Sequence, residues 1–170
     1  MSQSLINAFL KDLSILNDGL ICWGFAAGSG TGSMVTLHFG EKIVRESPLK
    51  NKYLSEDMRN YEGEQCLYLE DCDWRIQTST SVLASSLSSN EEGGEMLVAL
   101  NQLVGKRVTA AQLELPSFDL RLEFENDLRL VVFCFGKSLE DLDNYTFYSK
   151  EHSYTSKFNG KLESSEAKQI

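Results

Sequence analysis

The chain has 170 residues, of which 42% are hydrophobic and 10% aromatic, a composition that supports one packed domain of ordinary size and argues against disorder. It carries 25 acidic and 16 basic side chains, for a formal charge of −9. Because nucleic-acid binding needs cations that neutralise phosphates, this balance argues against a nucleic-acid partner. It favours a basic protein as any partner, although acidity is also found in proteins without one.

Lys11 and Asp12 interrupt the apolar face of residues 4–16, which argues against a secretory signal, and the chain has no apolar run of about 18 residues that would predict a membrane span. We therefore expect a cytoplasmic protein with no membrane partner. In that compartment free thiols are expected rather than disulfides. The cysteines concerned are Cys22, Cys66, Cys72 and Cys134.

The first predicted element is a helix. Apolar residues recur at helical spacing from Leu5 to Leu16, and Gly19 supplies a terminator. Residues 20–26 then form an apolar and aromatic run, typical of a strand, that ends at the glycine-rich stretch 28–32.

Residues 34–39 and 43–45 flank a short turn at 40–42, which predicts a hairpin. Residues 46–59 are weakly periodic and are expected to be irregular. Two further strands are predicted at 65–69 and 74–80. A second helix is predicted at 95–104, closed by Gly105.

The last third of the chain returns to strands, predicted at 107–115, 119–124, 128–135 and 144–149. Residues 125–127 predict a hairpin turn. The continuous apolar stretch 130–135 predicts a central strand buried on both faces. Residues 151–170 are polar and are expected to form a C-terminal tail.

Two parts of the chain resemble each other, roughly residues 20–80 and 105–149. Each has a Leu-x-Phe strand, a turn and an aliphatic strand, and later a Leu-Glu-Asp-x-Asp segment before an aromatic strand. A match in the same order relative to a hairpin indicates an internal repeat; the alternative is that any two β-meanders share alternation and acidic turns. With both helices, the pattern predicts one α+β domain over residues 1–150, with a mainly antiparallel sheet from two similar halves.

The glycine-rich stretch 28–32 does not match a phosphate-binding loop. No Gly-Lys-Ser/Thr sequence follows it, and Ser33 stands where a dinucleotide fingerprint needs its third glycine. Because a strand rather than a helix is predicted next, we expect a flexible connection between two strands.

No catalytic, cofactor or metal site is predicted. The histidines, His38 and His152, lie far apart in the sequence, and Cys66 and Cys72 lack paired Cys-x-x-Cys spacing. His38 is expected to be a surface or hydrogen-bonded histidine. We therefore expect a protein that is not an enzyme. A hydrolase without a known motif would need His38 to meet a serine and a carboxylate in one cleft.

Acidic side chains gather in two segments that also carry aromatic residues, at 60–74 and 138–148, and neither segment contains a lysine or arginine. Carboxylates beside exposed aromatics are typical of surfaces that bind a cationic partner. The alternative is that the acids occupy solvated turns while the aromatics face the core. The partner-binding candidates are Glu62, Glu64, Glu70, Asp71, Asp73, Glu140, Asp141, Asp143 and Tyr145.

The order of these features resembles bacterial immunity proteins of contact-dependent growth inhibition and other polymorphic toxin systems. The resemblance rests on the Gly-Lys-Arg-Val sequence at 105–108, the strand and hairpin at 118–132 and the Asp-Trp-Arg-Ile sequence at 73–76. It implies binding and neutralisation of one cognate toxin domain, often a nuclease with a basic surface. A small-ligand-binding or scaffolding domain, with a groove lined by aromatics of both halves, is the alternative function.

Overall fold

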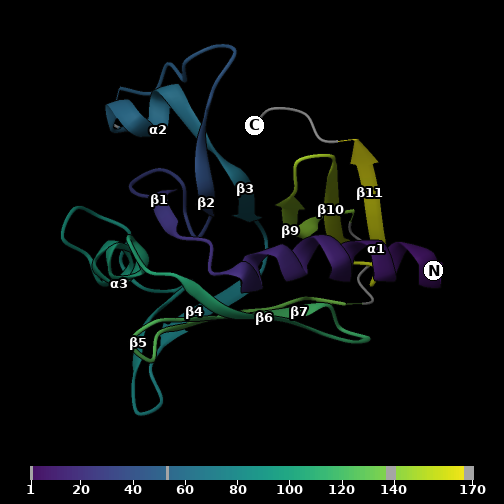
Figure 1. Ribbon diagram of the computed structural model, residues 1–170. Helices are drawn as coiled ribbons and strands as arrows, with labels where there is room; N and C mark the ends of the chain where they lie inside the picture. Colours follow the sequence, from purple (N-terminus) through teal and green to yellow (C-terminus); the bar gives the residue numbers. More distant parts are fainter. Residues whose placement is uncertain (1, 53, 137–140, 167–170) are drawn as a thin grey trace.

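The structure, a computed structural model, describes residues 2–52, 54–136 and 141–166 and has the expected α+β fold (Figure 1). Its strands form two antiparallel sheets, in the orders β1-β2-β3-β9-β10-β11 and β5-β4-β8-β7-β6. The six-stranded sheet contains Cys22–Ala26 (β1), Val35–Val44 (β2), Tyr61–Leu69 (β3), Asp143–Tyr148 (β9), His152–Lys157 (β10) and Leu162–Glu166 (β11). The five-stranded sheet contains Asp73–Gln77 (β4), Val82–Ser85 (β5), Val108–Glu114 (β6), Asp119–Phe124 (β7) and Arg129–Phe133 (β8).

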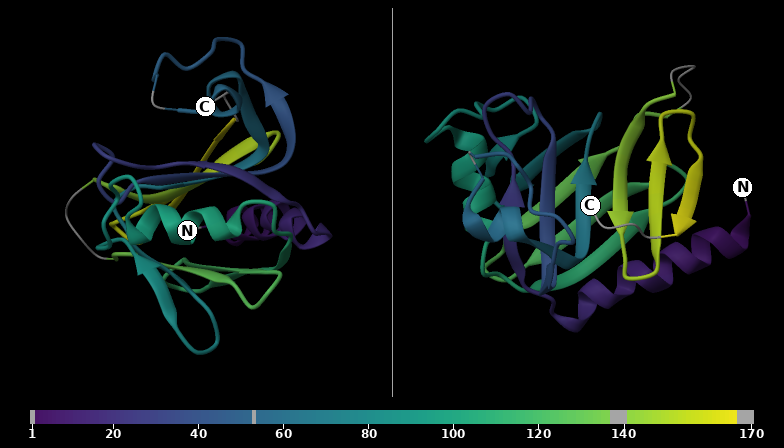
Figure 2. Two further views of the ribbon diagram at one scale, coloured as in Figure 1. Left: turned by 90° about the vertical axis from the view of Figure 1, so that its left-hand side faces the viewer. Right: turned by 90° about the horizontal axis from the view of Figure 1, so that it is seen from above.

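The helices are Gln3–Ser14 (α1), Glu56–Asn60 (α2) and Glu95–Leu103 (α3), and a 3-10 turn follows α1. The predicted N-terminal and central helices are confirmed. α1 lies along one side of the molecule between the two sheets (Figures 1 and 2), where Phe9 stacks on Tyr154 with ring centroids 4.9 Å apart. Gly19, at a φ of +80°, ends this helical segment in a left-handed conformation that glycine adopts without strain.

The two sheets pack face to face around one hydrophobic core (Figure 2). Strand register places four inward-pointing side chains in one row across β2, β3, β9 and β10: Leu37, Leu67, Phe147 and Tyr154. From the five-stranded sheet, Trp74 enters the same core and its indole N–H donates to the carbonyl oxygen of Ser33 at 2.8 Å. The buried indole therefore has a hydrogen-bond partner, which offsets its loss of water.

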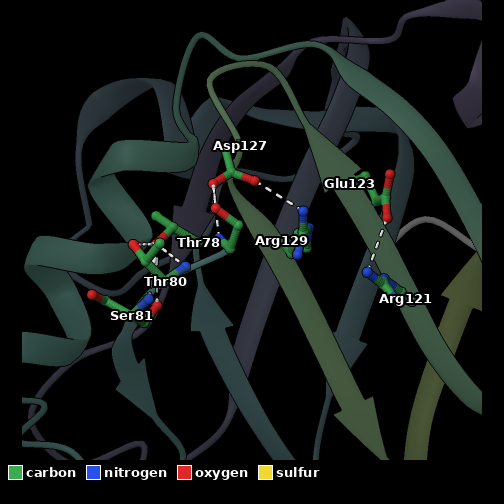
Figure 3. Close-up of polar contacts among 8 residues, drawn as sticks. Thr78, Thr80, Ser81, Arg121, Glu123, Asp127 and Arg129 are labelled. Carbon is green, nitrogen blue, oxygen red and sulfur yellow. Dashed lines mark hydrogen bonds and ion pairs between the residues drawn. The ribbon is translucent and has the colours of Figure 1, made fainter.

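The turn between β7 and β8 is tied to the connection between β4 and β5 (Figure 3). The Asp127 carboxylate accepts hydrogen bonds from the Ser79 N–H at 2.8 Å and hydroxyl at 2.6 Å, and it lies 2.9 Å from Arg129. The Ser79 hydroxyl is the main cause of a lowered pKa of Asp127. Asn126 and Asp127 have φ values of +63° and +59°, which these residue types tolerate in tight turns. The hairpin predicted at 125–127 is confirmed.

The hairpin predicted at 40–42 is wrong, because β2 runs unbroken from Val35 to Val44. The strand absorbs the irregularity as a shift in register between Phe39 and Lys42, with Gly40 at a φ of +76°. The β7–β8 hairpin thus has no matching turn in the first part of the chain. Part of the segment expected to be irregular forms the short helix α2.

The tail predicted at 151–170 is also wrong over most of its length, since β10 and β11 belong to the six-stranded sheet. β10 pairs with β9 on one side and β11 on the other. β10 is rich in serine and threonine, and Tyr154 is the one large side chain that it contributes to the core. The sequence of β10 therefore lacks the alternating apolar pattern that predicts a strand. Hydrogen bonds to its neighbours, rather than an apolar pattern, define this strand.

Candidate functional site

The chain changes sheets at two places that lie side by side. Residues 70–72 lead from β3 to β4, and the chain after β8 leads back to β9. Because β3 pairs with β9 and β4 pairs with β8, both connections reach the same end of the two sheets. The backbone N–H of Glu70 donates to the carbonyl oxygen of Asn144, and that of Asp71 to the carbonyl oxygen of Asp143, each at 3.0 Å.

This crossing brings together carboxylates from both acidic segments of the sequence: Glu70, Asp71, Asp73, Asp141 and Asp143. Burial raises the pKa of Glu70, and the negative charges of Asp143 and Asp71 raise it further. Among the described residues, Lys157 offsets them in part, since its Nζ lies 2.6 Å from Asp143 and 3.4 Å from Asp141. The described carboxylates outnumber this lysine, so this part of the crossing carries a net negative charge.

Exposed apolar side chains lie beside the carboxylates. Phe135 is 47% exposed and Leu142 is 39% exposed. Together with Phe158, Asp71 and Asp73 they line an open hollow of about 270 Å³. The rings of Phe135 and Phe158 are 5.2 Å apart, at an interplanar angle of 59°. The crossing therefore presents aromatic surface and negative charge together.

A buried amide fixes the backbone that carries Phe135. Asn144 is fully buried, and its Oδ1 accepts the Phe135 N–H at 2.7 Å while its Nδ2 donates to the Phe135 carbonyl at 3.0 Å. Two hydrogen bonds to one residue restrict its backbone and so hold the Phe135 side chain at a defined place on the surface. The acidic crossover surface consists of Glu70, Asp71, Asp73, Phe135, Asp141, Leu142, Asp143 and Phe158.

Three other partner-binding candidates do not join this surface. Tyr145 is fully buried and its hydroxyl donates to the Phe118 carbonyl at 2.9 Å, so it belongs to the core. Glu62 is also buried and faces Arg45 at 3.0 Å. Glu64 lies 2.6 Å from Lys150. The fourth, Glu140, lies outside the described residues.

Sequence reasoning missed the apolar part of the surface, because the run at 130–135 suggested a strand buried on both faces. The central position of β8 is confirmed, but the burial is wrong: Leu130 and Val132 are buried, whereas Phe133 is 37% exposed. Strict alternation along the run, with Leu130 and Val132 inward, would have placed Phe133 and Phe135 outward. The two-residue period of β-strands, applied within this apolar segment, would therefore have predicted the exposed positions.

The structure also contains a cysteine–histidine pair. The Sγ of Cys66 lies 3.1 Å from Nδ1 of His38, which also accepts the Gly63 N–H at 3.0 Å. Burial raises the pKa of Cys66 to about 12, and burial and the charge of Arg45 lower the pKa of His38 to about 4. Because nucleophilic attack needs the thiolate, this buried neutral pair is unsuited to catalysis. His38 is hydrogen-bonded, as expected, but it lies in the interior rather than on the surface.

Within the described ranges, no three His, Cys, Asp or Glu side chains are grouped so that they could hold a metal ion. No helix in that part of the chain is long and apolar enough to cross a membrane. Comparison of the chain with protein-family models, curated proteins and solved structures gave no match.

Proposed function

We propose that this protein is a cytoplasmic inhibitor that binds a basic protein through the acidic crossover surface, in the way that an immunity protein neutralises its cognate toxin domain. The observation that carries the proposal is the meeting of two acidic segments, far apart in the sequence, beside the exposed side chains of Phe135 and Leu142. The inhibitor acts by covering the partner's surface, without catalysis.

The two kinds of side chain have different tasks in such a complex. Buried aromatic residues near the centre of an interface commonly carry most of the binding free energy, so Phe135 is the expected anchor. Carboxylates at the margin speed association with a basic partner and suppress binding to acidic ones. Asp141, whose side chain is 84% exposed, is placed for the second task.

The first test is functional. The protein encoded by the gene immediately upstream is expressed alone and together with this chain, and growth of the host is measured. A toxic upstream protein that this chain neutralises, through a complex of one copy each, is the expected result. If that protein is a non-toxic metabolic enzyme, or is toxic but not neutralised, the proposal of an immunity protein is wrong.

Charge reversal then tests the surface. Asp71→Lys and Asp141→Lys should each weaken the complex by about tenfold or more at low salt, with a smaller effect at high salt. Glu151→Lys is the matched control, because this exposed carboxylate follows the opposite end of β9. Unchanged affinity in both Asp71→Lys and Asp141→Lys would exclude the acidic crossover surface as the interface.

A further inference from the structure

A large cavity, lined by residues outside the acidic crossover surface, lies beside the connection between β1 and β2. Its volume is about 1100 Å³, slightly above the range of about 300–1,000 Å³ that is typical of small-molecule sites. β1, β2 and α3 lie together on this side of the molecule (Figure 1). The residues that line it are Ala26, Ala27, Gly28, Ser29, Gly30, Thr31, Met34, Val35, Thr36, Asn51, Leu54, Tyr68, Glu92 and Leu97.

The glycine-rich connection forms one wall of this cavity and is held in a defined shape. The side-chain amide of Asn90 donates to the carbonyl oxygens of Gly28 and Gly32, both at 2.9 Å. Thr31 adds a hydroxyl hydrogen bond to the Gly28 carbonyl at 2.9 Å. Gly30 has a φ of +91°, a backbone conformation that residues other than glycine rarely adopt. The stretch connects two strands, as expected, but these hydrogen bonds oppose the flexibility that the sequence suggested and hold the wall in place.

The walls favour an apolar ligand without negative charge. Ala27, Met34 and Leu97 contribute apolar surface. None of the described lining residues is a lysine, arginine or histidine, and the one ionisable carboxylate among them is the exposed Glu92. An anion entering this cavity would lose water without gaining an opposite charge, which is strongly unfavourable.

One lining hydroxyl has spare hydrogen-bonding capacity. The Tyr68 hydroxyl donates to the Met34 thioether sulfur at 3.3 Å, and a thioether is a weak acceptor. Burial, followed by the charge of Glu70, raises the pKa of Tyr68, so the hydroxyl keeps its proton at neutral pH. A ligand oxygen would be a better acceptor for this proton than the sulfur is.

We infer that this cavity binds a small, largely apolar molecule that carries no negative charge and accepts a hydrogen bond from the Tyr68 hydroxyl. The cavity shares no lining residue with the acidic crossover surface, and the inference does not rest on the proposed function. The preformed wall at residues 28–32 and the apolar lining provide the binding surface, and Tyr68 provides the orientation.

Two fluorescent probes that share one ring system test the charge preference. Phenylnaphthylamine is uncharged, and anilinonaphthalene sulfonate adds a single negative charge to the same rings. Titration should show saturable binding of the amine, with the sulfonate weaker by about tenfold or more, equivalent to about 1.4 kcal/mol. Equal or tighter binding of the sulfonate, or no binding of the amine, would overturn the inference.

Paired substitutions on α3 test the location. Leu97→Trp places an indole into the cavity. Because the indole would occupy the space of the probe, amine binding should weaken by about tenfold or more. Val98→Trp, at a neighbouring position that is 52% exposed, should leave binding unchanged. Circular dichroism checks that both variants fold. If Leu97→Trp does not fold, Ala27→Phe fills the cavity from the connection that follows β1. Wild-type binding in a folded filling variant would place the probe elsewhere and overturn the inference.

A ketone probe tests the role of Tyr68. Prodan, an uncharged naphthyl ketone, offers the oxygen that phenylnaphthylamine lacks. Tyr68→Phe should weaken prodan binding by about fivefold, the effect of one hydrogen bond, and leave amine binding unchanged. Equal loss for both probes would indicate a structural role for Tyr68, and no loss for prodan would exclude the hydrogen bond.

Discussion

The backbone N–H of Asp71 donates a hydrogen bond to the carbonyl oxygen of Asp143 at 3.0 Å. The bond joins the connection that leaves the six-stranded sheet to the strand that re-enters it. It also brings Glu70 within the electrostatic influence of Asp143, which helps raise the pKa of Glu70. A protein that keeps like charges together at its surface loses stability in isolation and gains attraction for a cationic partner.

Removing one of these charges should stabilise the free protein. The folded-state pKa of Glu70 is raised above its ordinary value of 4.5, so the folded state binds the proton more tightly than the unfolded state. Glu70 therefore reduces stability as pH rises above that value. Glu70→Gln should raise the free energy of unfolding at pH 7 but not at about pH 3, below the ordinary pKa. Denaturant unfolding at both pH values measures this, and a less stable variant at pH 7 would contradict it.

The apolar part of the acidic crossover surface should matter for binding more than for stability. Leu142 and Leu10 are matched in exposure, at 39% and 38%, but Leu10 lies on α1. Leu142→Ala should weaken the complex by about fivefold or more, because Leu142 lies beside the proposed anchor Phe135 and would be buried with it. Leu10→Ala should leave the affinity unchanged. Calorimetric titration measures both affinities. Equal effects of the two substitutions would exclude Leu142 as a contact.

Acid should destabilise the protein through His38. Burial lowers its folded-state pKa from 6.5 to about 4, so the unfolded state binds more protons between these values. The free energy of unfolding should fall as pH decreases through this window, by about 1 kcal/mol per pH unit from this group. His38→Asn, whose Oδ1 replaces Nδ1 as the acceptor for Gly63, should show a smaller slope from pH 6.5 to 5. An unchanged slope would show that His38 does not titrate in this way.

The ion pair between Arg45 and Glu62 should be sensitive to removal of one partner. Both residues are 7% exposed and lie 3.0 Å apart. Arg45→Met removes the guanidinium that lies 3.0 Å from the buried Glu62 carboxylate and should lower the free energy of unfolding by about 3–5 kcal/mol. Asp57→Asn breaks an exposed pair with Lys42 and should change it by less than about 1 kcal/mol. Denaturant unfolding compares them, and a similar small loss for both would contradict a strong buried pair.

Tyr145 should behave as a core residue and not as a contact residue. Tyr145→Phe removes the 2.9 Å hydrogen bond to the Phe118 carbonyl and should lower the free energy of unfolding by about 1–2 kcal/mol. Because the ring remains in place, affinity for the partner should not change. Thermal unfolding and calorimetric titration measure the two quantities. If a fully folded Tyr145→Phe variant lost affinity for the partner, Tyr145 would have to be a contact residue after all.

The sequence predicted the elements whose signals are local. The spacing of apolar residues from Leu5 to Leu16 gave α1, and the alternation on both sides of residues 125–127 gave the β7–β8 hairpin. It failed where the local signal was weak or shared by two structures. A glycine at position 40 marks a turn or an irregular strand equally well, and the polar sequence of β10 has no strong apolar period.

The sequence by itself therefore determined the fold class, the two longer helices and the acidic character of two segments. Only the tertiary structure decided that Glu70 and Asp143 lie together, while Glu62 and Tyr145 are withdrawn into the interior. The physical reason is that side-chain alternation along one strand is a local property, whereas β3 and β9 become neighbours through hydrogen bonds between strands distant in the chain. The acidic crossover surface is a product of that pairing.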